Sequence, residues 1–467
     1  MSEAVSERVP ADRPRSTTPT TTQRAPRLAV VLAAGRSERM SELTGGGSKA
    51  LIRVGGLSLV ERAVRTLLSI GIEHVIVVVG FQAGPVAAVA NRVAPGRVRA
   101  AFAEEWSLGN GASLAAAEPH VAEEDLFLLV TTDHIFDDGA LPSLLAAGRP
   151  GVLVDHAPES DAWAEGTRVR LREEQAVAFS KELDDPSIDC GAFLLPRAVF
   201  DAQRRAAERG DGSLAGAVTE LARREPLEAV PLAHGTWWQD VDTPEDRARA
   251  SARLRRSLTK RTDGPISRYL NRPLSTRLSM ALAHLPLHPD VLSVIAFLVG
   301  LAGAWALGTG SGILGGLLVH ASSLLDGVDG EIARLRVRAR PGGALLDGFL
   351  DRLADAAILA GVAVWALAEG ADPTTVVLLA VAATAGAMLS MATKDRTAAL
   401  GLAPPPERFI GFLLGGRDGR LFLVTVLSLF GLPVAALVAV AVTSGLSLFV
   451  RLLLTRAEIK SPWPGAG

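Results

Sequence analysis

Four aspartates lie close together in a stretch of the chain that is otherwise strongly apolar: Asp326, Asp329, Asp347 and Asp351. Their spacings of three and four residues place each pair on one face of a helix, and the Pro-Gly-Gly sequence at 341–343 predicts a break between two neighbouring helices. A carboxylate at membrane depth costs about 2.5–3.5 kcal/mol on insertion scales, so the group requires a compensating cation. Clustered hard oxygen ligands suit Mg²⁺, Mn²⁺ or Ca²⁺, and we expect Mg²⁺ or Mn²⁺ here.

A simpler alternative is that these carboxylates only form ion pairs with nearby arginines. Four arginines stand between the two pairs of aspartates: Arg334, Arg336, Arg338 and Arg340. Pairing with arginine does not explain the regular spacing of the aspartates. We therefore favour a metal site.

A second set of charged residues follows an apolar segment near the beginning of the chain. Residues 28–35, LAVVLAAG, predict a buried strand that runs into a glycine turn, and the following loop contains Arg39 and Lys49. Such a loop suits phosphate binding. Residues 125–134, DLFLLVTTDH, predict another buried strand, which ends at Asp133. An acid at the carboxyl end of such a strand faces the ligand crevice of an α/β sheet, so we expect Asp133 to bind a metal. We expect His134 to orient its neighbours or to face solvent rather than to be a metal ligand.

Composition narrows the class of protein. The 467 residues include 48 Lys and Arg against 50 Asp and Glu, and this near-neutral balance argues against a nucleic-acid partner. The single cysteine, Cys190, excludes an internal disulfide and is expected to be a core residue. Residues 1–26 are rich in Ser, Thr, Pro and Arg and have no apolar core, so we expect a disordered tail rather than a secretory signal.

The remaining chain divides into an α/β domain (27–250), a linker with a juxtamembrane amphipathic helix (251–289) and an all-α membrane domain (290–460). Alternating strands and helices predict a Rossmann-like mixed sheet in the first domain. Six apolar segments in the last predict a six-helix transmembrane bundle. They run near 291–307, 313–325, 345–367, 375–391, 421–432 and 434–454. Lys and Arg are concentrated in alternate connections between the predicted membrane helices, and such connections face the cytoplasm. This pattern predicts a multi-pass protein of the cell membrane with cytoplasmic termini and a cytoplasmic α/β domain.

The aspartate stretch reads D-x-x-D-G-x-x-A-R, eight residues, then G-x-x-x-D-x-x-x-D. This pattern resembles the signature of the CDP-alcohol phosphotransferase family, with every position filled. The resemblance implies a homodimer of six-helix membrane domains, each of which binds two divalent metals. By this resemblance Asp326, Asp329 and Asp347 bind metal, and Asp351 is the general base or shares in metal binding. The other positions of the signature would give the nucleotide room or support its phosphates: Gly330, Gly343 and Arg334.

The first half resembles the nucleotidyltransferase family through LAAGRSERM and SKAL, although Ser37 and Ser48 replace a glycine and a proline of the family pattern. The resemblance implies that Arg39 and Lys49 hold the triphosphate and that Lys49 is catalytic. Further residues implied in nucleotide or phosphate binding are Ala34, Gly35, Asn110, Gly111 and Lys181. Asp189 matches a position around the acceptor phosphate. Of Asp240 and Asp242, we take Asp242 as the second metal ligand.

The segments GNGAS and TTDHIF resemble the inositol-1-phosphate cytidylyltransferases. The two halves together resemble the bifunctional family that joins this activity to di-myo-inositol phosphate phosphate synthase. The resemblance implies that CTP and inositol 1-phosphate give CDP-inositol, a CDP-alcohol. The inositol phosphate group then passes to a second inositol 1-phosphate, with release of CMP. A fused phospholipid synthase with a lipid acceptor is one alternative. A non-catalytic membrane anchor is another, which the intact acidic positions oppose.

A group of cations beyond the fourth apolar segment has two interpretations. One interpretation is that these cations only set the membrane topology and contact anionic lipids. They are Lys394, Arg396, Arg408, Arg417 and Arg420. They also fit a binding site for the acceptor phosphate, since arginine can donate two hydrogen bonds to a phosphate. We assign the acceptor phosphate to Arg396, Arg417 and Arg420.

Overall fold

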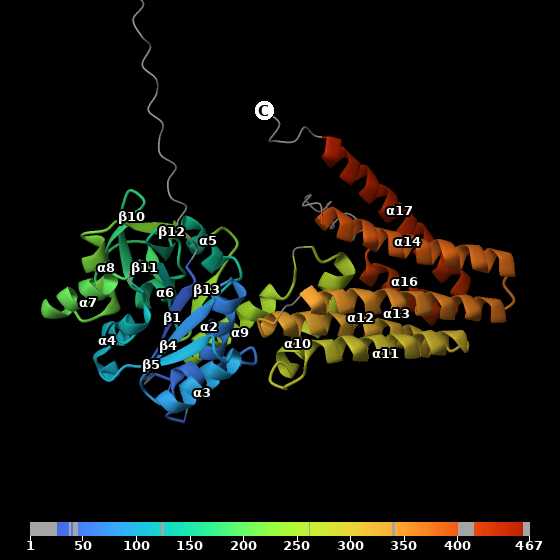
Figure 1. The fold of residues 1–467 in the computed structure, drawn as a ribbon. Coiled ribbons are helices and arrows are strands. Elements are labelled where there is room, and N and C mark those ends of the chain that lie inside the picture. Colours follow the sequence, from blue (N-terminus) through green and yellow to red (C-terminus); the bar gives the residue numbers. More distant parts are fainter. Residues whose placement is uncertain are drawn as a thin grey trace, which may run out of the picture.

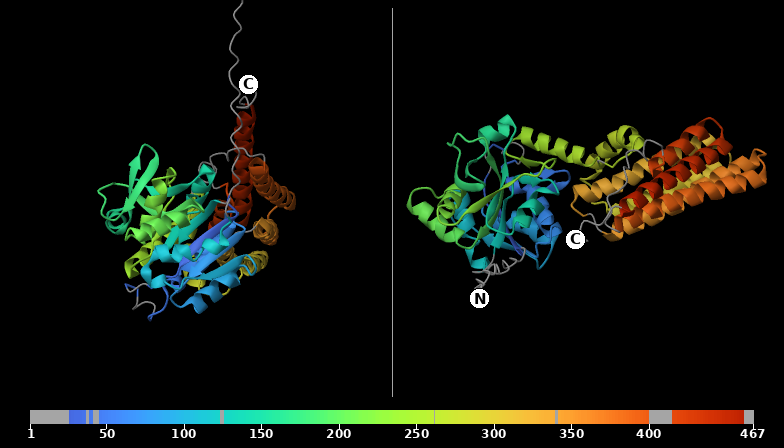
Figure 2. Two further views of the ribbon diagram at one scale, coloured as in Figure 1. Left: turned by 60° about the vertical axis from the view of Figure 1, so that its left-hand side comes forward. Right: turned by 90° about the horizontal axis from the view of Figure 1, so that it is seen from above.

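The computed structural model describes residues 26–36, 39–40, 45–122, 126–260, 262–338, 341–399 and 415–460. Nearly all of the predicted N-terminal tail lies outside these residues, as do Ser37 and Arg408. An α/β domain and a bundle of long helices lie next to one another and are joined by α9 (Pro244–Ser257) and α10 (Arg272–Leu282) (Figures 1 and 2).

The α/β domain is built on a nine-stranded mixed sheet with the order β5-β4-β1-β6-β11-β8-β12-β10-β9. Four strands at one edge are parallel: β5 (Val98–Phe102), β4 (His74–Val79), β1 (Leu28–Ala33) and β6 (Leu126–Thr131). Beyond them, β11 (Ile188–Pro196) is antiparallel to both of its neighbours, β6 and β8 (Gly151–Asp155). The sheet ends with β12 (Leu227–Pro231), β10 (Gln175–Ser180) and β9 (Arg168–Arg172). The prediction of a Rossmann-like mixed sheet is confirmed.

Helices cover both faces of this sheet, which explains why the strands are continuously apolar. Along β1, Val30 and Leu32 pack on one face, and Ala29, Val31 and Ala33 pack on the other. The first face is covered by α4 (Asn110–Ala115), α7 (Val199–Glu208) and α8 (Leu214–Ala222). The second is covered by α2 (Leu59–Ser69), α3 (Ala83–Val93) and α5 (Ala140–Ala147). Cys190 is buried in the second layer, as expected of a core residue.

The helix α9 passes from the α/β domain toward the bundle and crosses the boundary that we placed at residue 250. It begins with a capping box, in which the Thr243 side chain accepts from the Asp246 amide and the Asp246 carboxylate accepts from the Thr243 amide. Leu254 and Leu258 pack in one apolar cluster with Val54 of the α/β domain and Leu335 of the bundle. The two domains therefore share buried contacts and are not joined by a free tether.

All six predicted apolar segments are helices. They are α11 (Pro289–Gly308), α12 (Gly312–Leu335), α13 (Pro341–Ala368), α14 (Pro373–Ala399), α16 (Arg417–Leu429) and α17 (Pro433–Lys460). Among the residues described, three helical stretches are long and apolar enough to cross a membrane: Pro289–Gly308, Pro373–Thr397 and Pro433–Ala457. Acidic residues lower the hydropathy of α12 and α13, and α16 has only 13 residues. Six transmembrane spans therefore stay a prediction.

A buried polar network fixes α10 against α12. The Glu331 side chain is fully buried and accepts hydrogen bonds from Arg272 at 2.5 Å, Ser275 at 2.7 Å and Ser279 at 2.6 Å. The exposed side of this juxtamembrane segment carries apolar residues such as Tyr269 and Leu274. The segment is thus amphipathic, with its polar face on the protein.

A tight hairpin of the α/β domain also contacts the juxtamembrane segment. Gly55 and Gly56 form the turn between β2 (Arg53–Val54) and β3 (Leu57–Ser58), and both have positive φ, at +57° and +86°. Such a turn requires left-handed conformations at both positions. A Cβ atom added to Gly56 would lie 2.1 Å from the backbone oxygen of Ala283.

We expect Gly56→Ala to lower the Tm clearly more than Gly96→Ala. Gly96 has a similar φ of +82°, but an added Cβ would meet nothing within 4 Å. The control thus carries only the cost of a left-handed alanine, about 1–2 kcal/mol, whereas Gly56→Ala must also displace backbone. Thermal unfolding in detergent compares the two variants. Equal shifts in Tm would contradict the tight docking of this hairpin.

Candidate active sites

The sheet topology brings the predicted residues of the first half to one edge. β1 and β6 are parallel neighbours, with Leu32 opposite Thr131, so the loop after β1 and the residues after β6 emerge together. This is the point at which ligands bind in open α/β sheets. The short strands β7 (His134–Phe136) and β13 (Trp238–Asp240) pair antiparallel, which places Asp240 opposite His134.

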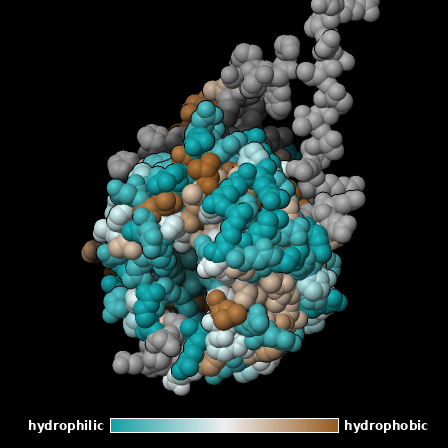
Figure 3. Space-filling model, turned by 90° about the vertical axis from the view of Figure 1, so that its left-hand side faces the viewer, coloured by the Kyte–Doolittle hydropathy of each residue, from teal (hydrophilic) through white to brown (hydrophobic). Residues whose placement is uncertain are grey.

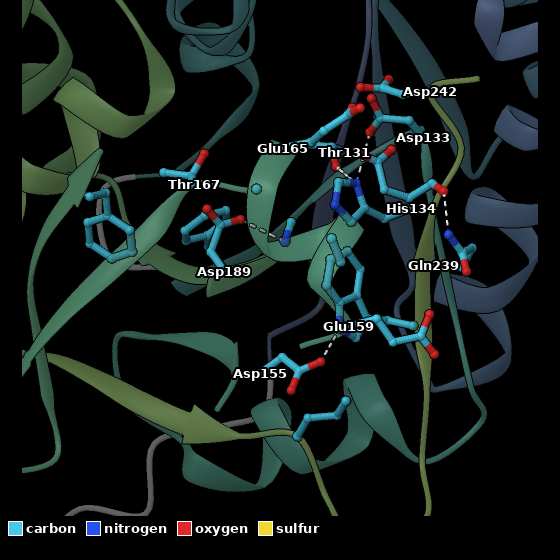
Figure 4. Close-up of a pocket in the computed structure, with 18 of the residues that line it drawn as sticks. Thr131, Asp133, His134, Asp155, Glu159, Glu165, Thr167, Asp189, Gln239 and Asp242 are labelled. Atoms are coloured by element: carbon cyan, nitrogen blue, oxygen red, sulfur yellow. Dashed lines mark hydrogen bonds and ion pairs between the residues drawn. The ribbon is translucent and has the colours of Figure 1, made fainter. Parts of the chain in front are cut away.

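Lys49 is the centre of this first site. Its Nζ lies 2.8 Å from an Asp133 oxygen and 3.9 Å from an Asp240 oxygen, and it donates a short hydrogen bond to Asp242. Arg39 approaches the same group, with a guanidinium nitrogen 3.2 Å from Asp242. Asp133 and Asp242 lie side by side at the top of the pocket (Figure 4). The structure therefore brings together Arg39, Lys49, Asp133 and Asp242, as the sequence analysis expected.

His134 is held as a cation by its surroundings. Burial alone would lower the pKa of His134, but Asp240 and Asp133 raise it to about 9. Its Nδ1 lies 2.9 Å from an Asp133 oxygen, and its ring stacks on Trp238. Burial favours the neutral form of Asp133, but Lys49 and His134 outweigh this effect and hold the pKa of Asp133 well below its usual range. A protonated imidazole cannot bind a metal, so this geometry supports an orienting role for His134.

A cavity of about 860 Å³ extends from these carboxylates into the α/β domain. Its far wall carries Asp155, Lys181 and Asp189, and burial raises the pKa of Asp189. The face of the α/β domain that is turned toward the viewer in Figure 3 is mainly hydrophilic and is hollowed. Cations such as Lys181, Arg249 and Arg253 line the cavity together with several carboxylates, and this mixture suits a ligand that carries both a phosphate and hydroxyl groups.

The cavity contacts some of the predicted nucleotide-binding residues and not others. Asn110 and Lys181 line it, whereas five others are outside its lining: Ala34, Gly35, Arg39, Lys49 and Gly111. Gly111 has a packing reason to be glycine, because an added Cβ would lie 2.0 Å from the Gly212 oxygen. The GNGAS pattern thus marks a close approach of two backbones.

The second candidate site lies in the helical bundle. Asp326 of α12 and Asp347 and Asp351 of α13 each offer a carboxylate oxygen, all within 4.8 Å of one another. The neighbouring Asp329 is buried and accepts a short hydrogen bond from Ser293 of α11. Both α12 and α13 pack against α11, which holds the two acidic pairs in a fixed relation. Three of the four predicted aspartates therefore converge from two helices, and Asp329 is not among these three.

Arg417 enters this acidic group from the first turn of α16. One of its terminal nitrogens lies 2.8 Å from Asp326 and 2.9 Å from Asp351, and its Nε donates to Asp355 at 3.0 Å. Arg420 also contacts Asp355, at 3.3 Å, whereas Arg396 is exposed near the end of α14. The three predicted acceptor-phosphate residues thus divide between the acidic group and the surface.

The remaining positions of the membrane signature surround this group. Arg334 donates to the Leu258 oxygen at 3.3 Å, which connects it to the end of α9. An added Cβ at Gly330 would lie 3.4 Å from Arg334, and one at Gly343 would lie 3.6 Å from Asp290. Both glycines therefore face side chains rather than tightly packed backbone, which leaves room beside the carboxylates.

Comparison with known proteins agrees with this two-part arrangement. The family model for a MobA-like NTP transferase domain matches residues 29–262, and the model for CDP-alcohol phosphatidyltransferase matches residues 286–443. A bifunctional IPC transferase and DIPP synthase of Rubrobacter xylanophilus is 38% identical over 433 residues, which cover 91% of this chain and 95% of that protein. The chain belongs to the bifunctional IPC transferase and DIPP synthase family. It is therefore a transferase with a nucleotidyltransferase domain and a CDP-alcohol phosphotransferase domain.

One further relative matches nearly the whole chain, and one solved structure matches about half of it. The bifunctional IPC transferase and DIPP synthase of Aquifex aeolicus is 31% identical over 441 residues, with 91% of this chain and 97% of that protein covered. The solved inositol-1-phosphate CTP transferase from T. maritima is 24% identical and has a TM-score of 0.44. The match covers 48% of this chain and 92% of the T. maritima chain.

Both acidic groups of this family member offer the ligands that a divalent metal prefers. In the bundle, three carboxylates converge, and only hard oxygen donors are present among them. In the α/β domain, Asp133, His134 and Asp240 form a comparable group, although the charge on His134 favours the aspartates as ligands. Our choice of Asp242 over Asp240 stays a prediction, since both contact Lys49.

Two residues at these sites were not singled out from the sequence. Asp240 was noted but passed over, although its position two residues before Asp242 places both on the same side of an extended segment. Asp355 continues the four-residue spacing of Asp347 and Asp351 along α13. That periodicity was the available signal, but the family signature ends at Asp351.

We expect Asp240→Asn to lower the pKa of His134 from about 9 toward its ordinary value of about 6.5. The reason is that the negative charge of Asp240 is the largest single effect that stabilises the imidazolium against burial. NMR titration of labelled histidine without divalent metal measures the shift. Asp201→Asn, at an exposed aspartate of α7, is the control and should leave the titration unchanged. An unchanged pKa in Asp240→Asn would contradict the assigned contact.

Proposed function

We propose that this protein makes CDP-inositol from CTP and inositol 1-phosphate in its α/β domain. The helical domain then transfers the inositol phosphate group to a second inositol 1-phosphate and releases CMP. One observation carries the proposal: each half keeps a complete acidic and basic cluster within the segment that matches its own family model. The names of the relatives over the whole chain support the same pair of substrates.

In the α/β domain, the acceptor phosphate attacks the α-phosphorus of CTP, and pyrophosphate leaves. Lys49 and Arg39 would hold the triphosphate, because both are cations beside the proposed metal ligands Asp133 and Asp242. Lys181 on the far wall of the cavity would bind the phosphate of inositol 1-phosphate, and Asp155 and Asp189 accept hydrogen bonds from the ring hydroxyls. A divalent metal held by Asp133 and Asp242 or Asp240 would neutralise phosphate charge.

In the helical domain, the acceptor hydroxyl attacks the β-phosphorus of the CDP-alcohol, and Asp351 takes the proton. Asp326, Asp329 and Asp347 would hold divalent metal, which supplies charge neutralisation for the leaving CMP. Arg417 contacts the same carboxylates, so the acceptor phosphate would bind directly beside the reacting groups. Arg420 and Arg396 complete the proposed set of acceptor-phosphate residues.

A lipid acceptor is the second candidate. Leu345 and Phe349 on α13 are 77% and 59% exposed, and they lie on either side of Asp347 in the sequence. Both project from the face of α13 opposite Asp347, and this apolar face of a helix that bears the acidic group suits contact with a lipid. Mass spectrometry of the product formed by membranes given CTP and inositol 1-phosphate distinguishes the two acceptors. A phosphorylated di-inositol phosphodiester supports the first candidate, and a phospholipid supports the second.

We expect Asp351→Asn to abolish CMP release while pyrophosphate release continues at the wild-type rate. Lys49→Met should abolish pyrophosphate release, whereas CMP release and the final product should continue at the wild-type rate when CDP-inositol is added. The reason is that the two residues belong to clusters on separate domains. Coupled assays for pyrophosphate and CMP measure both steps. Asp395→Asn, at a 65% exposed aspartate of α14, is the control and should leave both rates unchanged.

One outcome of this assay would argue against two separate sites. If either substitution removes both activities in protein that is still folded, the two reactions share one site. Folding is checked by circular dichroism and by the Tm of the purified variant.

We further propose that all six helices cross the membrane and that both termini and the α/β domain are cytoplasmic. The protein would form a homodimer through these helices, in contact with membrane lipids. Reporter fusions at Gly370 and Gly467 should then give opposite signals, because Lys and Arg flank the cytoplasmic connections. Gly370 lies in the connection between α13 and α14. Equal signals from the two fusions would contradict the six-span topology.

A further inference from the structure

Within the described residues, the backbone that follows α12 caps part of the C-terminal end of this helix. Its last turn is followed by Val337, which has a φ of +48°. The amide of Arg338 donates to the Ala333 oxygen at 2.8 Å, and the amide of Val337 donates to the Arg334 oxygen at 3.0 Å. This is a Schellman arrangement. It leaves the next two carbonyls, those of Leu335 and Arg336, without a backbone partner of this motif.

Two arginines of the α/β domain supply the missing donors. Arg62 donates to the Leu335 oxygen at 3.0 Å, and Arg65 donates to the Arg336 oxygen at 3.2 Å. Both project from α2, three residues apart and thus on one face of that helix. Arg62 is 6% exposed and also donates to the Val54 oxygen at 2.9 Å, which fixes its direction. Positive charge at a helix C-terminus is favoured by the helix dipole.

Apolar packing surrounds these hydrogen bonds and excludes water. Leu335 is 1% exposed and shares a cluster with Met40, Val54, Leu254 and Ala283. Three of these residues belong to the α/β domain or to α9, and Met40 directly follows Arg39 of the nucleotide loop. Without Arg62, the Leu335 carbonyl would be buried without a partner, which costs about 1–3 kcal/mol.

The capped helix is the one that carries half of the membrane site. Asp329 lies six residues before Leu335, a rise of about 9 Å, and Arg334 lies in the last turn itself. An uncapped turn frays, and loss of that turn would release Arg334 and loosen the segment that bears Asp326 and Asp329.

We propose that Arg62 and Arg65 are positioning residues for the phosphotransferase reaction in the neighbouring domain. They complete the C-terminal cap of α12 and thereby fix Asp326, Asp329 and Arg334. This inference rests on the proposed function of the helical domain. Neither arginine contacts the acidic group, so they act through the helix alone.

The test uses full-length protein in membranes, supplied with CDP-inositol and inositol 1-phosphate. Two variants are compared with the wild type: Arg65→Met, and the double variant that combines it with Arg62→Met. In both, the Mg²⁺ concentration that gives half-maximal CMP release should rise by about 10-fold. This is the lower end of the range for losing a residue that orients metal ligands. Pyrophosphate release from CTP should change less than twofold. Arg62→Lys keeps a cationic donor toward the Leu335 oxygen, so Arg62→Lys combined with Arg65→Met should lose less than the double methionine variant.

Two measurements do not depend on activity. Amide hydrogen exchange should increase in residues 333–338 of both methionine variants, and Mn²⁺ binding measured by electron paramagnetic resonance should weaken. Arg53→Met is the matched control, because Arg53 donates to the Gly56 oxygen of the same hairpin but makes no hydrogen bond to α12. It should leave exchange and metal binding unchanged.

Unchanged Mg²⁺ dependence, exchange and Mn²⁺ binding in the double variant would overturn the inference. A parallel loss of both activities in Arg65→Met would also overturn it, because the contact would then support folding in general. If wild-type protein releases no CMP from these substrates, the proposed function fails instead. The exchange and Mn²⁺ measurements then still decide whether the arginines position α12.

Discussion

Carboxylates that are gathered out of water must have positive charge beside them, and both candidate sites are built on this constraint. In the α/β domain, three aspartates surround Lys49. In the bundle, Arg417 reaches Asp326, Asp351 and Asp355. Each site therefore holds its acids in place through a cation from a different element of the chain. The same cations would also bind the phosphate groups of the substrates. One set of residues therefore balances the charge of the buried acids and binds substrate.

Each cation has a position that the surrounding secondary structure determines. Lys49 lies at the start of a short 3₁₀ helix, η1 (Lys49–Leu51), after the loop that follows β1. Arg417 lies in the first turn of α16, and Asp355 holds its Nε. Both therefore reach across to acids that belong to other strands or helices. Such long-range contacts form only when the whole domain has folded, which couples the geometry of each site to the stability of its domain.

The sequence was sufficient to predict the sheet, the six helices of the bundle and the residues at the centre of both sites. The apolar strand before Asp133 and the regular spacing of Asp347 and Asp351 carry that information locally. What the sequence did not show depends on contacts between distant segments. The pairing of Asp240 with His134 follows from the β7 and β13 ladder, and the position of Arg417 within the acidic group follows from the packing of α16 on α12. The helix α9 crosses the boundary predicted at residue 250, because the charged residues of this segment indicated a linker although Ala250 and Leu254 are buried.

The hydrogen bonds from Arg62 and Arg65 to the end of α12 have a consequence for how such a chain evolves. Two enzymes that are merely tethered can be separated by cutting the gene between them, because each half keeps its own structure. Here one half completes a helix of the other and covers Leu335. Separation would expose an apolar side chain and two unpaired carbonyls on the membrane half. A gene fusion of this kind is therefore hard to reverse. Substitutions on α2 are also limited by the need to keep the membrane site in the other domain active.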